Sequence, residues 1–122
     1  MADVFFWIIS INRIFFYDIE FAQPRNIFFG HLLAICVGIL VNSLLGVSFF
    51  SLGLSVALSV TLMIYFKIIH PPAAANPLIA IFADVSYDFI LFPVIAGSII
   101  LILLSILINK FLFKRKYPKR FI

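Results

Sequence analysis

The chain has 122 residues, of which 65% are hydrophobic and only 11% are charged, and its formal net charge is +4. Soluble domains carry about 25% charged residues, and a water-soluble fold of this size has too much surface to hide so apolar a sequence. The composition therefore excludes a soluble protein and predicts one integral membrane domain, whose partner is the lipid bilayer. Six basic residues crowd positions 110–122, which after a membrane span is typical of a cytoplasmic end rather than of a nucleic-acid site.

Residues 1–21 are predicted to form a short apolar segment, either interfacial or the remnant of a truncated helix. The apolar stretch 4–17 contains Arg13 and is shorter than the roughly 20 residues that a helix needs to cross the hydrocarbon core. We therefore divide the chain into this segment, a transmembrane domain at 22–109 and a basic cytoplasmic tail at 110–122.

The first transmembrane helix is predicted at 27–45, with Asn26 as its N-cap and Gly46 as its C-terminal cap. Small or polar residues recur every four positions, which places them along one side of the helix. Such rows let two helix backbones approach closely in lipid. The row consists of Gly30, Ala34, Gly38 and Asn42.

A second helix is predicted at 49–69, and it carries two stripes of small residues. The linker 46–48 is very short, so the two helices should form an antiparallel hairpin with their small faces in contact. The plainer interpretation is that small residues merely dilute the helix. The stripes consist of Gly53, Ala57 and Thr61, and of Ser51, Ser55 and Ser59.

The stretch 70–77 lies between two apolar runs and contains three prolines. Each proline lacks an N–H and clashes with the preceding helical turn, so Pro71 should end the second helix and leave 70–76 non-helical. Asn76 is then expected to cap a short helix at 77–84 that has Pro77 in its first position. The distribution of basic residues favours a segment that crosses the membrane over one that re-enters on the same side.

The third long helix is predicted at 89–108, twenty residues without a charge, with Pro93 causing at most a modest kink near its start. The fold class is thus all-α. We predict a polytopic helical membrane protein with three long transmembrane helices plus a short, broken helix after the His-Pro-Pro motif.

Five polar side chains are candidates for a substrate site, because polar and ionisable groups inside spans are costly and usually functional. The predicted hairpin brings them to one membrane face, where the short helix adds its positive dipole end. Cationic and imidazole groups around a cavity favour a small inorganic anion. Each residue also has a plainer explanation as an interface anchor, a core hydrogen-bonding group or a helix cap. The five are Arg25, Asn26, His31, His70 and Asn76.

The sequence shows no pattern of a metal centre or of catalysis. Two histidines without a nearby carboxylate or cysteine make a poor metal site, and we expect neither a metal nor another cofactor. Nucleophile–base pairs, suitably spaced carboxylates and glycine-rich phosphate loops are all missing from the sequence, so we expect no enzyme. The single cysteine, Cys36, is interpreted as a packing residue.

Two separated motifs resemble the HPP family of integral membrane proteins. The first is Gln23-Pro24-Arg25-Asn26 followed by Gly30-His31, and the second is His70-Pro71-Pro72 leading to Asn76-Pro77. The resemblance covers roughly 22–108 and implies a compact bundle of membrane helices, with nitrite transport associated with plant and cyanobacterial members. The chain departs from the family pattern at Ala74, where glycine is common, and before Gln23, where members normally have one or two further helices. The expected structural motif residues are Gln23, Pro24, Gly30, Gly38, Pro71, Pro72 and Pro77.

The residues and the resemblance together predict a membrane transporter or channel for a small, nitrite-like anion. The alternatives are a structural or interaction membrane protein without transport activity, and a degraded family member. A chain rich in Phe, Ile and Asn is typical of AT-rich bacterial genomes, so a bacterial inner (plasma) membrane is expected, with the C-terminus in the cytoplasm. The small-residue faces predict a homo-oligomer.

Overall fold

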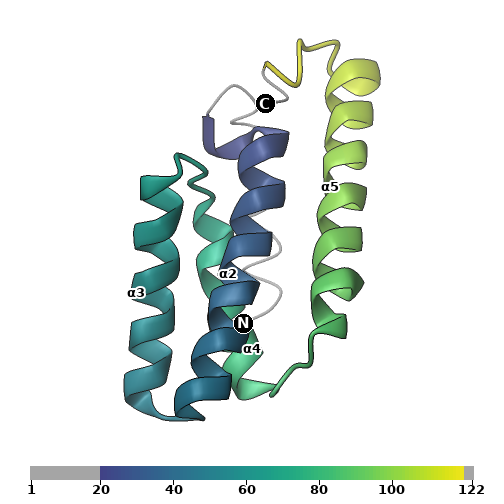
Figure 1. Cartoon of the computed structure of the whole chain (residues 1–122). Coiled ribbons are helices and arrows are strands. Elements are labelled where there is room, and N and C mark those ends of the chain that lie inside the picture. Colours follow the sequence, from purple (N-terminus) through teal and green to yellow (C-terminus); the bar gives the residue numbers. More distant parts are fainter. Residues whose placement is uncertain (1–19, 120–122) are drawn as a thin grey trace.

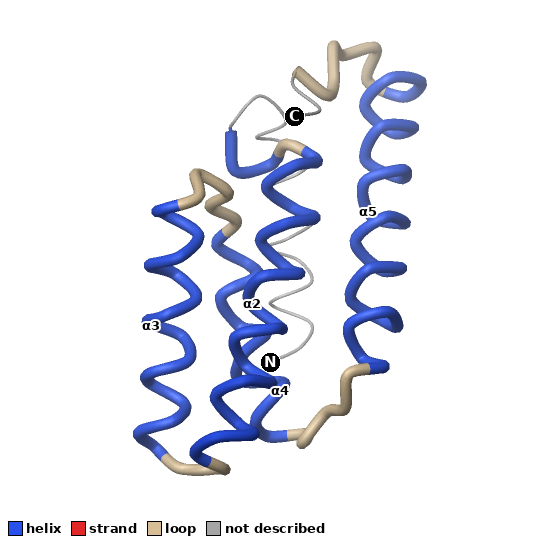
Figure 2. The backbone as a smooth tube through the Cα atoms, in the orientation of Figure 1, coloured by secondary structure: helices blue, strands red, loops and turns tan. Residues whose placement is uncertain are grey.

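The computed structural model describes residues 20–119, and within this range every regular element is helical. Four α-helices form an elongated bundle (Figures 1 and 2). Positions 1–19 and 120–122, and with them most of the segment predicted at 1–21, lie outside the described residues. The α-helices are α2 (Pro24–Leu45), α3 (Phe49–Tyr65), α4 (Asn76–Phe82) and α5 (Ala96–Leu107), and the shorter 3-10 or π-helical elements are η1 (Glu20–Ala22), η2 (Pro71–Ala75), η3 (Ile90–Ile95) and η4 (Ile108–Leu112).

The four helices run in alternating directions, so the start of α2, the end of α3 and the C-terminal tail meet at one end (Figure 1). There the Arg25 guanidinium lies 3.5 Å from the carbonyl oxygen of Phe66. The Tyr117 hydroxyl of the tail donates to the carbonyl of Ala22 at 2.8 Å. We call this the basic end, and define it by Arg25, Lys67 and the tail residues 114–119.

The opposite end joins the end of α2 to the end of α4. Asn42 Nδ2 donates to the Asp84 carboxylate at 2.7 Å. The segment that follows α3 therefore runs from the basic end along the bundle to the other end (Figure 1). This is the path expected of a crossing segment, and a re-entrant segment would have returned to the basic end.

Two helical stretches are long and apolar enough to cross a membrane, Pro24–Leu45 and Ile90–Leu112. α3 has 17 residues, and the helical stretch Pro71–Phe82 is shorter still. The prediction of three long transmembrane helices is therefore not confirmed, because α3 ends at Tyr65 instead of continuing to 69.

α3 ends in a turn of the Schellman type, several residues before the prolines. Lys67 has a φ of 55°, its N–H donates to the Ile64 carbonyl at 3.1 Å, and the N–H of Ile68 donates to the Met63 carbonyl at 2.9 Å. Glycine usually occupies the left-handed position of this motif. Because a lysine occupies it here, the sequence carries no sign of the helix end, and the prediction that Pro71 terminates the helix is wrong.

The prolines of the His-Pro-Pro motif are themselves part of a helical stretch. Pro71–Ala75 form η2, which passes directly into α4, so the non-helical backbone is confined to 66–70. Proline is tolerated in the first turn of a helix, where its N–H would have no partner anyway. The prediction of a non-helical stretch at 70–76 therefore holds only at His70 and is wrong for 71–76. Asn76 is the first residue of α4, and Ala75 precedes it as the N-cap.

α2 begins three residues earlier than predicted. Gln23 is its N-cap and Pro24 opens its first turn, which places Asn26 inside the helix and releases its side chain for the contact described below. At the other end the prediction is confirmed. Gly46 has a φ of 63° and donates its N–H to the Asn42 carbonyl at 2.8 Å.

The glycine row of α2 packs on the His-Pro-Pro segment and α4. A Cβ atom added to Gly38 would lie 2.6 Å from Cα of Pro77 and 2.8 Å from Cβ of Ala80. Only glycine lets the two backbones come this close. The prediction that the small faces of the first two helices contact each other is therefore wrong, since α4 supplies the partner surface for α2.

α3 buries one of its two small-residue stripes and exposes the other. The buried stripe consists of serines, and the hydroxyl of one of them, Ser55, donates back to the Leu52 carbonyl at 2.9 Å. A Cβ atom added to Gly53 would meet nothing within 4 Å. The buried stripe is Ser51, Ser55 and Ser59, and the exposed one is Gly53, Ala57 and Thr61.

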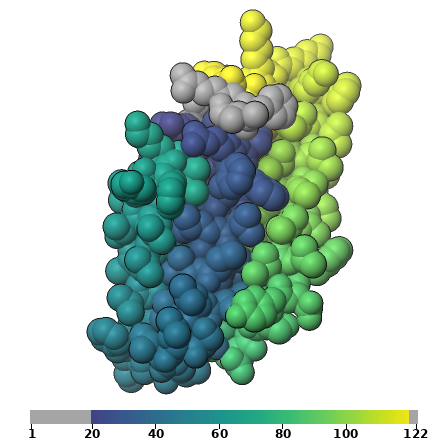
Figure 3. Space-filling view, viewed as in Figure 1, coloured from purple at the N-terminus to yellow at the C-terminus, as the bar shows by residue number. Residues whose placement is uncertain are grey.

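The last helical stretch is the less enclosed of the two long ones. In its most apolar window 17% of the residues are buried, against 44% for α2, and the space-filling view shows α2 held between α3 and α5 (Figure 3). Phe92 leaves helical geometry (φ −130°, ψ 123°), as expected for the residue before a proline. Pro93 therefore marks a local break in place of the modest kink predicted.

Candidate functional site

Four of the five predicted site residues come together where the start of α2 meets the His-Pro-Pro segment. Asn26 contributes the contact nearest the basic end: its Nδ2 donates to the carbonyl oxygen of Ile69 at 3.0 Å. Ile69 belongs to the non-helical stretch 66–70, whose carbonyl groups have lost their helical partners. The buried carboxamide of Asn26 therefore supplies a hydrogen bond that the interrupted backbone needs.

His70 is the buried centre of the cluster, with only 4% of its surface exposed. Its Nδ1 lies 2.7 Å from the carbonyl oxygen of Phe21. A carbonyl oxygen can only accept, so Nδ1 carries the proton in this contact. The short helix η1 places that carbonyl, and the bond fixes the ring orientation of His70.

Asn76 connects α4 to His31 on α2. Asn76 Nδ2 lies 3.0 Å from His31 Nδ1 and 3.2 Å from the His31 carbonyl oxygen. The carbonyl contact identifies the nitrogen side of the carboxamide, so His31 Nδ1 is the acceptor and the neutral imidazole carries its proton on Nε2. The rings of His31 and His70 lie edge to face, with centroids 5.1 Å apart.

Gly30 makes this approach of the two histidines possible. A Cβ atom at this position would lie 2.8 Å from Cβ of His70 and 3.2 Å from the Ile68 carbonyl oxygen. The glycine that precedes His31 therefore creates the space into which the His-Pro-Pro backbone fits. This explains physically why the first motif has glycine at position 30.

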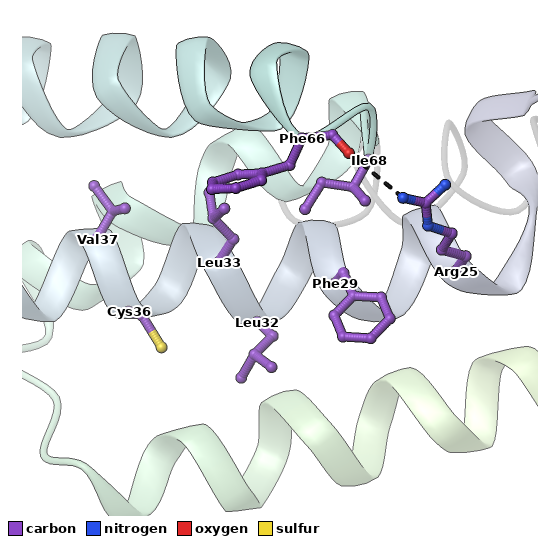
Figure 4. Close-up of a pocket in the computed structure, with 8 residues that line it drawn as sticks. All are labelled: Arg25, Phe29, Leu32, Leu33, Cys36, Val37, Phe66 and Ile68. Atoms are coloured by element: carbon purple, nitrogen blue, oxygen red, sulfur yellow. Dashed lines mark hydrogen bonds between the residues drawn. The ribbon is translucent and has the colours of Figure 1, made fainter. Parts of the chain in front are cut away.

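The structure does not bring Arg25 into the cluster. Its guanidinium turns toward the Phe66 carbonyl and lines a separate, apolar groove (Figure 4). Successive residues of an α-helix point about 100° apart, so Arg25 and Asn26 cannot both face the same partner. The prediction that Arg25 shares one site with the histidines is corrected accordingly.

The expected anion site at the N-terminus of the short helix is also corrected. η2 precedes α4 without a gap, so α4 has no separate N-terminus with open N–H groups. The helical stretch opens with Pro71 and Pro72, which have no N–H, and the N–H of Ala73 donates to the His70 carbonyl at 2.9 Å. The expected N–H donors are therefore absent, because prolines occupy the first two positions of the helical stretch.

Sequence reasoning missed Lys67 as a neighbour of the site. A hollow of about 140 Å³ at the basic end lies beside Asn26 and has Lys67 and Glu20 in its wall. Lys67 reaches this position because its left-handed backbone turns the chain out of α3, and nothing in the sequence pattern signals that turn. Within residues 20–119, no three histidine, cysteine or acidic side chains are grouped to hold a metal ion.

A bundle of apolar helices, interrupted between α3 and η2 and held together there by carboxamide and imidazole side chains, defines a polytopic helical membrane protein. The HPP transmembrane region family model matches residues 14–118, and the chain belongs to that family. Two transmembrane proteins of Dictyostelium discoideum are each 34% identical over 105 residues, covering 80% of this chain and 37% or 34% of their own lengths. The chain thus spans about a third of the curated relatives it matches. No solved structure matches it.

Proposed function

We propose that the chain is a transport protein or channel for a small inorganic anion, with nitrite as the substrate suggested by the family resemblance, and that it has no enzymatic activity. The observation that carries the proposal is the cluster at the interrupted helix, in which Asn26, His70 and Asn76 are buried and His31 is partly buried. Polar groups at such depth in an apolar bundle are costly, and they commonly mark substrate paths.

The proposed path enters at the basic end. Lys67 and the Asn26 carboxamide border the hollow of about 140 Å³, and together with the basic tail they favour an anion over a cation. Glu20 lies in the same wall and opposes entry, so the net preference comes from the surrounding cations. From this hollow the proposed path continues toward the two imidazoles. His70 follows Ile69 in the non-helical stretch, and His31 lies five residues beyond Asn26 along α2.

Histidine chemistry gives the proposed path a pH dependence. His70 uses Nδ1–H in its bond to Phe21, so a second proton on Nε2 adds a positive charge without breaking that bond. His31 accepts from Asn76 through Nδ1, so its protonation at that atom requires the carboxamide to rotate. Histidine is the side chain that changes charge near physiological pH, so we expect the proposed anion flux to depend on pH.

We further propose a homo-oligomer in a bacterial inner membrane with the basic end in the cytoplasm. The cations gathered at that end satisfy the positive-inside rule. The exposed stripe Gly53, Ala57 and Thr61 on α3 offers a small-residue face for a second copy. In such an assembly the neighbouring copy completes the wall of the path.

Flux measurements in proteoliposomes test the proposal. Native protein should take up nitrite faster than protein-free liposomes, and His70→Gln should lower the uptake about tenfold or more, since a hydrogen bond to a charged group contributes about 1.5–3 kcal/mol. Tyr65→Phe, which alters an exposed side chain of α3, should retain native flux. Equal uptake by native protein and His70→Gln would exclude the proposed site.

One observation favours the alternative of a structural or interaction membrane protein. Asn26 and His70 each donate a hydrogen bond to a backbone carbonyl. Side chains that only stabilise the fold would make the same contacts. That alternative predicts a folded protein that conducts neither nitrite, nitrate nor chloride at any pH. A degraded family member predicts the same absence of flux together with a lower thermal stability.

A further inference from the structure

An apolar groove of about 580 Å³ runs along α2 and is bordered by residues just after α3, apart from the histidine cluster. Phe29, Leu32 and Cys36 point from α2 toward α5, and Phe66 and Ile68 contribute the wall from the end of α3 (Figure 4). The volume is within the range of about 300–1,000 Å³ that is usual for small-molecule sites. Leu33 and Val37 complete the apolar lining.

The groove is polar at one end only. Arg25 is the single charged residue among those that line it, and it belongs to the first turn of α2, at the basic end. Its guanidinium has five N–H donors, more than the one Phe66 carbonyl at 3.5 Å can accept. The Cys36 end, in contrast, is surrounded by aliphatic side chains.

The length of the groove is close to the thickness of one leaflet of a bilayer. Arg25 and Cys36 are eleven residues apart, which corresponds to about 17 Å along a helix axis. Half of the hydrocarbon core of a bilayer is about 15 Å thick. The groove therefore extends from the level of the lipid headgroups to about the midplane, on the leaflet that faces the basic end.

We propose that this groove binds one acyl chain of an anionic glycerophospholipid, with the lipid phosphate on Arg25. Such a lipid is apolar over the depth of one leaflet and carries its negative charge at the outer end. The groove has the same arrangement, because its lining is apolar apart from Arg25 at the basic end. A helix of a second copy does not match, since it would continue past the midplane. The neighbouring cations of the basic end add to the preference for a negative headgroup.

Lipid retention tests the proposal. Protein reconstituted in equimolar phosphatidylglycerol and phosphatidylcholine, then purified in mild detergent, should retain phosphatidylglycerol in preference when analysed by native mass spectrometry. Arg25→Gln should lower this preference about fivefold, the factor expected for one basic residue at an anionic surface. Lys110→Gln removes an exposed cation from η4, outside the groove lining and outside the basic end, and should keep the native preference. Equal loss in both variants, or no loss in Arg25→Gln, would overturn the proposal.

The reactivity of the Cys36 thiol gives a second readout of an occupied groove. Cys36 is exposed and lies at the inner end of the groove, so bound lipid should slow its reaction with a maleimide. Phosphatidylglycerol should protect it in the native protein and in Lys110→Gln, and should protect it much less in Arg25→Gln. Disulfide-linked dimers through Cys36 would place a second copy in the groove and would also overturn the proposal.

Discussion

Replacing Gly38 by alanine is expected to lower the free energy of unfolding by about 3 kcal/mol, the upper part of the range for overpacked sites. The added methyl group would lie 2.6 Å from Cα of Pro77 and 2.8 Å from Cβ of Ala80. Because Cα is a backbone atom, no side-chain rotation relieves the clash, and α4 must move away from α2. Titration of mixed micelles with a denaturing detergent, followed by circular dichroism, measures the change.

Gly97→Ala is the matched control, since it makes the same chemical change in α5, outside the face of α3 proposed for a second copy. A Cβ atom there meets nothing within 4 Å, and alanine is the better helix former. We expect the stability to remain within about 0.5 kcal/mol of the native value, as is usual for surface substitutions. Equal effects of the two substitutions would show that α4 does not pack on the glycine row.

Asn26→Asp is expected to have the second large effect, a destabilisation of about 3–5 kcal/mol at neutral pH, typical of an uncompensated buried charge. The substitution keeps the shape of the side chain but replaces the N–H donor with a carboxylate oxygen that faces the Ile69 carbonyl. At acidic pH a protonated carboxyl can donate to the same carbonyl, so stability should recover as the pH falls.

Asn26→Ala distinguishes the lost hydrogen bond from the added charge. It leaves the Ile69 carbonyl without its side-chain donor, for which we expect a cost of about 1–3 kcal/mol that does not vary with pH through the carboxyl range. The same unfolding titration, repeated at several pH values, measures both variants. An Asn26→Asp variant as stable as the native protein at neutral pH would contradict the proposed role of this carboxamide.

The parts of the fold that were predictable are those with a local chemical cause. The apolar run of α2 and its cap at Gly46 follow from hydropathy and from the φ of 63° that glycine allows. The end of α3 was not predictable, because Lys67 takes the left-handed position that glycine usually marks. The partner of the Gly38 row was not predictable either, since α3 and α4 both offer small residues and only the assembled bundle decides between them.

The candidate site shows the same division. The two histidines and the two asparagines lie in motifs that the sequence displays, and their convergence follows from the helix order. The placement of Arg25 was not predictable, because the helix was expected to begin at 27 and in fact begins at Pro24. Arg25 and Asn26 are therefore both helical, and their side chains point about 100° apart. Lys67 lies beside the site because of a left-handed backbone turn that no sequence pattern indicates. The expected N–H donors at the start of the short helix are missing because prolines occupy those positions.

The path of the His-Pro-Pro segment across the membrane is the central claim, and cysteine labelling from one side tests it most directly. In a Cys36→Ser background, Lys67→Cys, Ser86→Cys and Lys114→Cys are made separately, because all three side chains are exposed. A membrane-impermeant maleimide is then added to one side of sealed vesicles. The structure predicts that Lys67→Cys and Lys114→Cys react from the same side and Ser86→Cys only from the opposite side. Labelling of Lys67→Cys and Ser86→Cys from one side would contradict the crossing path.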